Sequence, residues 1–419
     1  MTSVATAERV ASRGSVWKWW VCGLLLLATM LNYMDRVTFN QTATRIIAEF
    51  KLSKEQYGLI ESVFAQAFAF GALLAGWLAD RYNVRWIYAA AVLLWSLAGF
   101  LTGFVQSYLE LLLFRSLLGL FEAGNWPCAL RTTQRILPPH ERTLGNGILQ
   151  SGASLGALIT PIVVLFFLSR TGSWRPPFWV VGAVGTVWVV LWLVSVRRED
   201  LTLPDWDKQA QVQPGGPGLG ELVRDRRFWV LAVMVVTLNA TWHFFRAWLP
   251  LFLSESHHYN DQEMNWFISA YYLSADVGTL SAGAVALWLV RRGLPVHRSR
   301  GLVLLGCALL TTLSVPAAYL PRGPLLLAVL LLIGFGSLGC FPNYYSFSQE
   351  LTVRHQGKVT GTLGFISWEA QVVLQYLTGV SVERNQSYTL GIVVAGFLPL
   401  IAWLVLALFW RTNETEAKA

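Results

Sequence analysis

The chain has 419 residues, of which 54% are hydrophobic and only 13% are charged, and its mean hydropathy is +0.48. Soluble domains carry about 25% charged residues, so this composition excludes a protein whose surface mostly faces water. In a soluble protein the net charge of +8 would suggest a nucleic-acid partner. Cytoplasmic loops of membrane proteins are rich in Lys and Arg, so here we expect no nucleic-acid partner.

Apolar stretches of the length of a membrane-spanning helix recur along the whole chain. Such a helix needs roughly 20 apolar residues, so the pattern predicts an all-α membrane protein embedded in a lipid bilayer. We expect about twelve spans, at residues 17–42, 56–80, 85–106, 108–134, 142–169, 176–196, 226–254, 263–290, 300–320, 323–349, 357–381 and 387–411.

One hydrophilic segment divides these spans into two sets of about six. It predicts an N-terminal six-helix half at 1–196, a cytoplasmic linker at 197–227, and a C-terminal six-helix half with a short cytoplasmic tail at 228–419. Most of the 32 Lys and Arg residues fall in the termini, the linker and every second loop. Positive residues concentrate on the cytoplasmic side, so we expect a multi-pass protein of the cell (inner) membrane with both termini in the cytoplasm.

The two halves share weak internal similarity. Gly71 and Gly76 have the spacing of Gly278 and Gly283, and the sequence GNWP at 124–127 is echoed by GCFP at 339–342. Both pairs of motifs are separated by nearly the same distance along the chain. Two pseudo-symmetric halves with a site near mid-membrane are a known transporter plan.

Span one carries Tyr33, Asp35 and Arg36 in the sequence NYMDR. A charge at bilayer depth costs at least about 2.5–3.5 kcal/mol, so two adjacent charges need a reason. Neighbouring residues point about 100° apart on a helix, so Asp35 and Arg36 serve different contacts. We interpret them as a titratable carboxylate beside an anion-binding guanidinium. The alternative is an ion pair that ties helices together.

The segment between spans two and three reads GWLADRYNVR, from Gly76 to Arg85. It resembles the signature of the major facilitator superfamily, Gly-x-Leu-x-Asp-Arg-x-Gly-x-Arg, with Asn83 in place of the second Gly. Gly76 would allow close helix contact, and Asp80 with Arg81 and Arg85 would form a cytoplasmic gate that breaks when the halves rock apart. The alternative is a simple cluster of interfacial charges.

Span four carries Arg115, Gly119 and Glu122 at spacings of four and three residues, which place them on one face of a helix. Asn125 follows Glu122 by three residues. A polar stripe on an apolar helix faces a cavity or a partner helix and not lipid. Arg115 and Glu122 are roughly 10 Å apart along the axis, so we expect no direct contact between them. Glu122 in an apolar setting would hold a proton near neutral pH.

Polar residues also recur on spans of the C-terminal half. His243 lies in span seven, Asn343 and Ser346 in span ten, and Gln371 in span eleven. Such rows suit the recognition of substrate hydroxyl groups, and they equally suit hydrogen bonding between helices. We include all four residues in the candidate substrate site.

Longer runs of residues are similar to the anion:cation symporter family and its hexuronate-transporter branch. They are the run from Arg115 to Pro127, the segments 139–142 and 147–156, the stretch from 275 to 293, and the span-one motif. The resemblance implies import of sugar acids or other organic anions together with protons. By the same resemblance, Asp35 and Glu122 match the protonatable acids of the family, Arg36 and Arg115 match its basic site residues, and Tyr33 lies in the same motif. Ala153 stands where some members have Gln or Asn, which leaves the particular sugar acid open.

We therefore expect a monomeric proton-coupled symporter for a small organic anion, most simply a hexuronate or aldonate. Its proton carriers would be Asp35 and Glu122. Its substrate residues would be Arg36, Arg115, Tyr33, Asn125, His243, Asn343, Ser346 and Gln371. A proton gradient would supply the energy, so we expect no cofactor and no metal. Proton-coupled efflux of a drug or metabolite, and uptake of a non-sugar carboxylate, remain alternatives. The sequence shows no nucleophile–base pair, metal set or phosphate loop, which argues against an enzyme, and the linker is short for a receptor's output domain.

Overall fold

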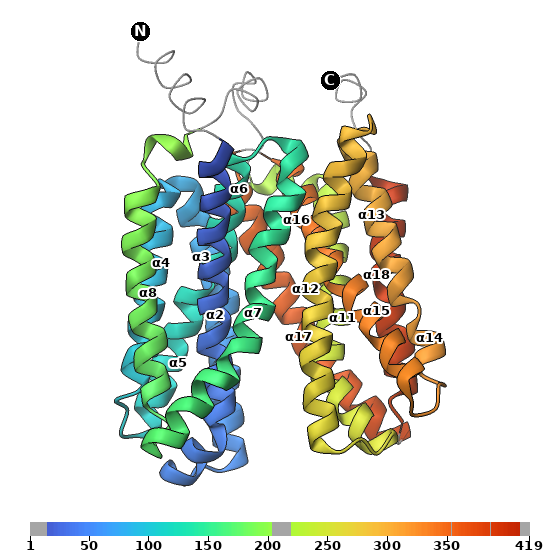
Figure 1. Cartoon of the computed structure of the whole chain (residues 1–419). Coiled ribbons are helices and arrows are strands. Elements are labelled where there is room, and N and C mark those ends of the chain that lie inside the picture. The colour runs from blue at the N-terminus through green and yellow to red at the C-terminus, as the bar shows by residue number, and fades with distance from the viewer. Residues whose placement is uncertain (1–14, 203–218, 353, 386, 411–419) are drawn as a thin grey trace. The chain divides into compact units, whose positions relative to one another are not determined.

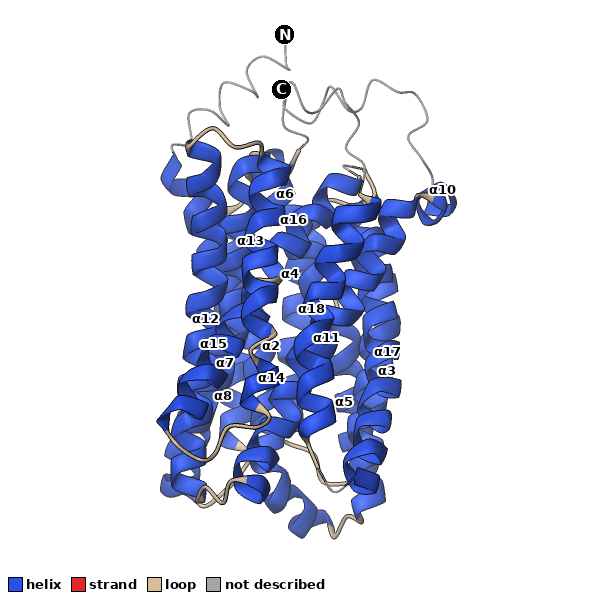
Figure 2. Ribbon diagram, turned by 90° about the vertical axis from the view of Figure 1, so that its right-hand side faces the viewer, coloured by secondary structure: helices blue, strands red, loops and turns tan. Residues whose placement is uncertain are grey.

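The computed structural model describes residues 15–202, 219–352, 354–385 and 387–410. Within these ranges every regular element is a helix, as Figure 2 shows, and the prediction of an all-α protein is confirmed. Most of the predicted linker and the predicted C-terminal tail lie outside the described residues. The helices are labelled as in Figure 1.

The first half of the described chain contains these helices: α2 (Ser15–Phe50), α3 (Lys54–Arg81), α4 (Val84–Thr102), α5 (Tyr108–Glu122), α6 (Asn125–Ile136), α7 (Pro139–Thr171), α8 (Pro176–Ser195) and the 3₁₀ turn η1 (Glu199–Leu201). The second half contains α10 (Leu219–Arg224), α11 (Arg226–Leu251), the π-helical turn η3 (Phe252–Ser256), α12 (Asp261–Arg291), α13 (Val296–Thr311), α14 (Ser314–Ala317), α15 (Pro324–Gly339), α16 (Phe341–Leu351), α17 (Gln356–Asn385) and α18 (Thr389–Phe409).

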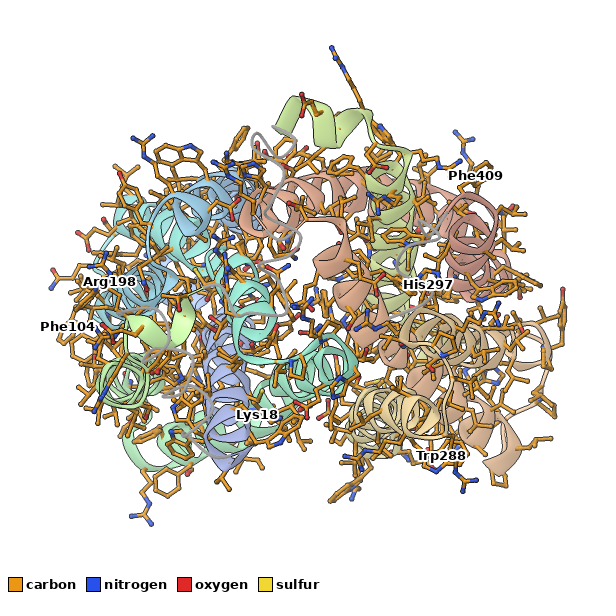
Figure 3. All side chains as sticks on the ribbon, turned by 90° about the horizontal axis from the view of Figure 1, so that it is seen from above. Lys18, Phe104, Arg198, Trp288, His297 and Phe409 are labelled. Atoms are coloured by element: carbon orange, nitrogen blue, oxygen red, sulfur yellow. The ribbon has the colours of Figure 1, made fainter. Side chains whose placement is uncertain are left out.

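Among the described residues, nine helical segments are long and apolar enough to cross a membrane. The three remaining predicted spans coincide with α2, with the α5–α6 pair and with α17, which carry charged and polar residues of the kind singled out in the sequence. Large apolar side chains such as Phe104, Trp288 and Phe409, which Figure 3 labels, are each about half exposed. Extensive apolar exposure of this kind fits contact with lipid.

The internal repeat is visible as two helix breaks. α5 ends at Glu122 and α6 begins at Asn125, whereas α15 ends at Gly339 and α16 begins at Phe341. Both breaks fall at the related GNWP and GCFP motifs. A proline lacks a backbone N–H and cannot continue the hydrogen-bond ladder of a preceding helix, which explains why each new helix begins just before its proline.

The repeat extends to the packing of corresponding glycines. A side chain on Gly71 would overlap the backbone carbonyl of Leu120, and one on Gly278 would overlap the carbonyl of Phe335. Leu120 and Phe335 each lie four residues before the Gly that opens its GNWP or GCFP motif. The two halves therefore pack corresponding glycines against corresponding backbone positions.

The described residues form two compact units. The first contains those up to Pro138, those within Ile148–Gly216 and those within Thr352–Phe365. The second contains Pro139–Gly147 and those within Pro217–Leu351 and Ile366–Ala419. The N-terminal end of α17 thus belongs to the first unit, and the N-terminal end of α7 belongs to the second.

We predict that Gly71→Ala and Gly278→Ala lower the melting temperature of the purified protein. Each added methyl group would overlap a backbone carbonyl, which cannot rotate out of the way as a side chain can. Matched controls are Gly23→Ala and Gly306→Ala, whose added methyl groups would meet nothing within 4 Å. Ala is a better helix former than Gly by up to about 1 kcal/mol, so the controls should keep or raise the melting temperature. Equal behaviour of all four variants would contradict the close packing.

Candidate functional site

Asp35 and Arg36 of α2 enter the interior of the first unit in different directions. Arg36 donates from Nε to Oε2 of Glu122 at 2.7 Å and from Nη2 to Oδ1 of Asn32 at 2.9 Å. Glu122 is fully buried and Arg36 nearly so, with side-chain exposures of 0% and 13%. Their contact forms a buried ion pair between α2 and α5.

Asp35 instead lies against α4. A methyl group on Gly99 would come within 2.7 Å of Asp35 Oδ1, so the absence of a side chain at Gly99 makes room for the carboxyl group. Asp35 is 2% exposed, and its Oδ1 has no hydrogen-bond partner among the described residues. Asp35 is therefore a buried carboxyl group that leaves one oxygen without a partner among the described residues.

Arg115 of α5 is buried beside aromatic rings. Its guanidinium carbon lies 4.1 Å from the ring centroid of Phe39 and 4.4 Å from that of Phe64. Nη2 contacts Oε1 of Glu61, on α3, at 3.1 Å. Within the described part of the chain, Nε and Nη1 of Arg115 have no hydrogen-bond partner. A buried guanidinium therefore keeps two of its three nitrogens available.

Phe64 of α3 links the two buried arginines. The guanidinium of Arg36 also lies over Phe64, at 5.4 Å, and over Phe68 at 4.5 Å and Tyr33 at 5.3 Å. Such contacts attract a cation to the face of the ring. A side chain on Gly119 of α5 would overlap the backbone carbonyl of Phe64. The glycine that the sequence places between Arg115 and Glu122 thus lets α5 approach the ring that both arginines share.

Asn125 is committed to contacts inside the first unit. It accepts a hydrogen bond from Tyr88 Oη at 2.7 Å and donates one to Thr29 Oγ1 at 3.1 Å. The structure therefore brings Tyr33, Asp35, Arg36, Arg115 and Glu122 into one neighbourhood, and it places Asn125 at the start of α6 as a link between helices.

Asp80, at the end of α3, is the centre of a latch with the beginning of α17. Its carboxylate accepts from Nη1 of Arg131 at 2.6 Å and from the backbone N–H groups of Gly357 and Lys358, both at 2.8 Å. A carboxylate at a helix N-terminus satisfies free N–H groups and complements the helix dipole. A side chain on Gly76 would overlap the carbonyl of Gly357, so the contact between the two helices also requires this glycine.

Arg81 and Arg85, predicted as gate residues, have other partners. Arg81 lies over the ring of Trp77 at 5.2 Å, and Arg85 donates to the carbonyls of Val196 and Leu193 at 2.6 and 2.9 Å. The arginine that pairs with Asp80 is Arg131, which the motif does not include. Its sequence signal is a charged residue within the last turns of predicted span four.

The predicted substrate residues of the second unit differ in how many of their polar atoms already have a hydrogen-bond partner. Ser346 Oγ contacts Thr143 Oγ1 at 3.0 Å and accepts from Asn146 at 3.2 Å, so it joins α16 to the start of α7. The ring of His243 lies 6.1 Å from that of Trp368.

Two other side chains of the second unit keep polar atoms available. Asn343 donates to Gly339 O at 3.4 Å, and its Oδ1 has no partner within the described ranges. Both polar atoms of the Gln371 amide lack one there as well. Asn343 Oδ1 and the Gln371 amide are therefore buried polar atoms with hydrogen-bonding capacity that the described residues leave unused.

We predict that Asp80→Asn destabilises the protein, because it removes the counter-charge of Arg131, whose side chain is only 10% exposed. Breaking a buried ion pair by removing one partner costs about 3–5 kcal/mol. Thermal unfolding of the purified variant measures this loss. Arg81→Gln is the control, since an exposed stacking contact should change the free energy of unfolding by only about 0.5 kcal/mol. A larger loss for Arg81→Gln than for Asp80→Asn would contradict the latch.

Comparison with known proteins relates the chain to a family. The family model described as Major Facilitator Superfamily matches residues 25–375. A probable sulfoacetate transporter of Cupriavidus necator is 28% identical, with 90% of each chain covered. A hexuronate transporter of Escherichia coli is 26% identical, covering 94% of this chain and 91% of the relative. The crystal structure of a fucose:proton symporter of Escherichia coli aligns with a TM-score of 0.75 at 13% identity, covering 95% of this chain and 99% of that one.

Proposed function

Because the chain belongs to the Major Facilitator Superfamily, and is therefore a multi-pass membrane transporter and not an enzyme, we propose that it is a proton-coupled symporter for a small organic anion. The leading substrate class is the sugar acids, such as hexuronates or aldonates. The proposed orientation has both termini in the cytoplasm and the protein in the cell membrane. A proton gradient drives import without a cofactor, and the working unit is the monomer.

The proposal rests on the guanidinium nitrogens of Arg115 that have no partner among the described residues. A planar guanidinium matches the two oxygens of a carboxylate, and charge-assisted pairs of this kind are the strong ones. Arg36 already uses Nε and Nη2 for Glu122 and Asn32. Arg115 keeps Nε and Nη1 without a partner among the described residues, in a setting where its side chain is 2% exposed. Of the two candidate arginines, Arg115 is the one that we assign to the substrate carboxylate.

The Arg36–Glu122 pair supports a role for protons in binding the anion. A proton on Glu122 removes the counter-charge of Arg36 and leaves an excess positive charge beside Phe64, the ring that Arg115 shares. That excess favours an anion at Arg115. By thermodynamic reciprocity, the bound anion then favours the proton to the same degree. In this scheme Glu122 couples the two ligands, and Asp35, which faces Gly99, is the second proton acceptor.

The names of the relatives support the substrate class. Hexuronate and sulfoacetate are both small organic anions, and the relatives named for their transport cover at least 90% of this chain. Ala153, which is buried at 2% exposure, cannot form a hydrogen bond through its methyl side chain. We therefore assign hydroxyl recognition to two amide side chains: Gln371, both of whose polar atoms lack a partner among the described residues, and Asn343, whose Oδ1 lacks one.

We predict that purified protein in proteoliposomes takes up galacturonate or glucuronate, and that an inward proton gradient raises the rate. Uptake of radiolabelled substrate with and without the gradient measures this effect, and gluconate and sulfoacetate extend the panel to other anions. Liposomes without protein are the control. Uptake that ignores the proton gradient would contradict symport, whereas uptake of sulfoacetate alone would move the substrate class away from sugar acids.

We predict that Glu122→Gln abolishes uptake driven by the proton gradient and retains counterflow exchange, because Gln keeps the shape of Glu but cannot carry a proton. Glu110→Gln, on the exposed first turn of the same helix, is the matched control and should behave like the wild type. Loss of both uptake and exchange would assign Glu122 a structural role instead.

We predict that Arg115→Lys weakens binding of galacturonate by roughly tenfold or more, since Lys keeps the charge but loses the planar pair of donors, and a difference of about 1.4 kcal/mol is tenfold in affinity. Titration of ligand-induced thermal stabilisation measures the dissociation constant. An unchanged constant would move the carboxylate site away from Arg115.

A further inference from the structure

Glu61 is an acid that the proposed transport cycle does not yet use. It lies on α3, one turn after Tyr57, whose ring stacks on Phe39 with centroids 5.9 Å apart and planes 5° apart. Phe39 in turn lies against the guanidinium of Arg115 at 4.1 Å. Glu61 therefore sits at the side of an aromatic enclosure around Arg115, and its Oε1 contacts Nη2 of that arginine at 3.1 Å.

The pair is unequal in burial. The side chain of Arg115 is 2% exposed and that of Glu61 is 36% exposed. Because its side chain is partly exposed, the carboxylate of Glu61 has space to rotate away from the arginine. Arg115 has no such alternative, because an unpaired charge in a buried site is strongly unfavourable. Glu61 can therefore leave the contact, whereas Arg115 stays in place.

The contact with Glu61 also leaves two nitrogens of the Arg115 guanidinium without a partner among the described residues. A guanidinium binds a carboxylate bidentately through Nε and Nη2 or through Nη1 and Nη2. Glu61 makes one contact, to Nη2, and the described residues offer no partner to Nε and Nη1. Nη2 belongs to both bidentate arrangements. A substrate carboxylate on Arg115 would consequently lie within a few ångströms of the Glu61 carboxylate, and the two like charges would repel each other.

We propose that Glu61 is the resident counter-ion of Arg115 and that it sets substrate affinity by competing with the substrate carboxylate for this guanidinium. In the empty carrier, Glu61 neutralises the buried arginine. When the anion binds, Glu61 turns away from Arg115 and the substrate takes its place. When the anion leaves, Glu61 returns and promotes release. This inference rests on the proposed function, because it takes Arg115 as the carboxylate site.

The test measures dissociation constants of the full-length protein for galacturonate and for its neutral methyl ester. Glu61→Gln removes the competing charge, so the constant for galacturonate should fall at least about fivefold, the lower end of typical couplings between sites. The constant for the methyl ester should stay the same, because the ester carries no charge to repel. A merely structural change would move both constants together. Glu55→Gln, on the exposed first turn of α3, is the matched control and should change neither.

Glu61→Asp provides a second variant that keeps the charge next to Arg115, in case Glu61→Gln folds poorly. Its carboxylate is withdrawn by one methylene group, so competition should weaken and galacturonate should bind more tightly than to the wild type, by less than with Gln. If wild-type protein binds galacturonate, an unchanged or higher constant in Glu61→Asp or Glu61→Gln overturns the role of Glu61 alone. If the wild type binds none of galacturonate, glucuronate, gluconate and sulfoacetate, the proposed function fails and this inference fails with it.

Discussion

The first unit is organised by the need to bury two guanidinium groups in an apolar interior. Arg36 and Arg115 solve this problem in different ways. Arg36 has a fully buried counter-ion in Glu122, whereas Arg115 has the partly exposed Glu61 and two aromatic rings. Breaking a buried pair is expensive, so the Arg36–Glu122 pair resists any anion unless a proton neutralises Glu122. In the proposed cycle, this difference assigns the proton to the Arg36–Glu122 pair and the anion to Arg115.

Small residues make this burial possible. Gly119 lets α5 approach Phe64, and Gly99 makes room for the carboxyl group of Asp35. Helices in a membrane associate mainly through close packing, since lipid offers no hydrophobic drive between them. The glycines therefore decide how near the charged residues lie to their neighbours, and the charges in turn account for the polar stripe of α5.

Helical periodicity predicted much of this arrangement. It placed Arg115 and Glu122 on one face without mutual contact, and it separated Asp35 from Arg36. In the structure Glu122 pairs with Arg36, and Arg115 pairs with Glu61. Periodicity could not choose these partners, because it orients a side chain on its own helix and does not say which neighbouring helix meets that face. Glu61 gave no separate signal, since an acid near the start of a span resembles an ordinary interfacial charge.

The latch at Asp80 has a consequence for how such contacts leave a trace in related sequences. Asp80 binds the backbone N–H groups of Gly357 and Lys358 and not their side chains. Substitution at position 358 would preserve the contact, so the two ends of this interaction need not change together during evolution. On the α17 side, the contact requires only that position 357 has no side chain. A Cβ added to Gly357 would meet the carbonyl of Gly76 and the carboxylate of Asp80. Searches for co-varying residue pairs would therefore overlook this contact, although an invariant glycine would mark it.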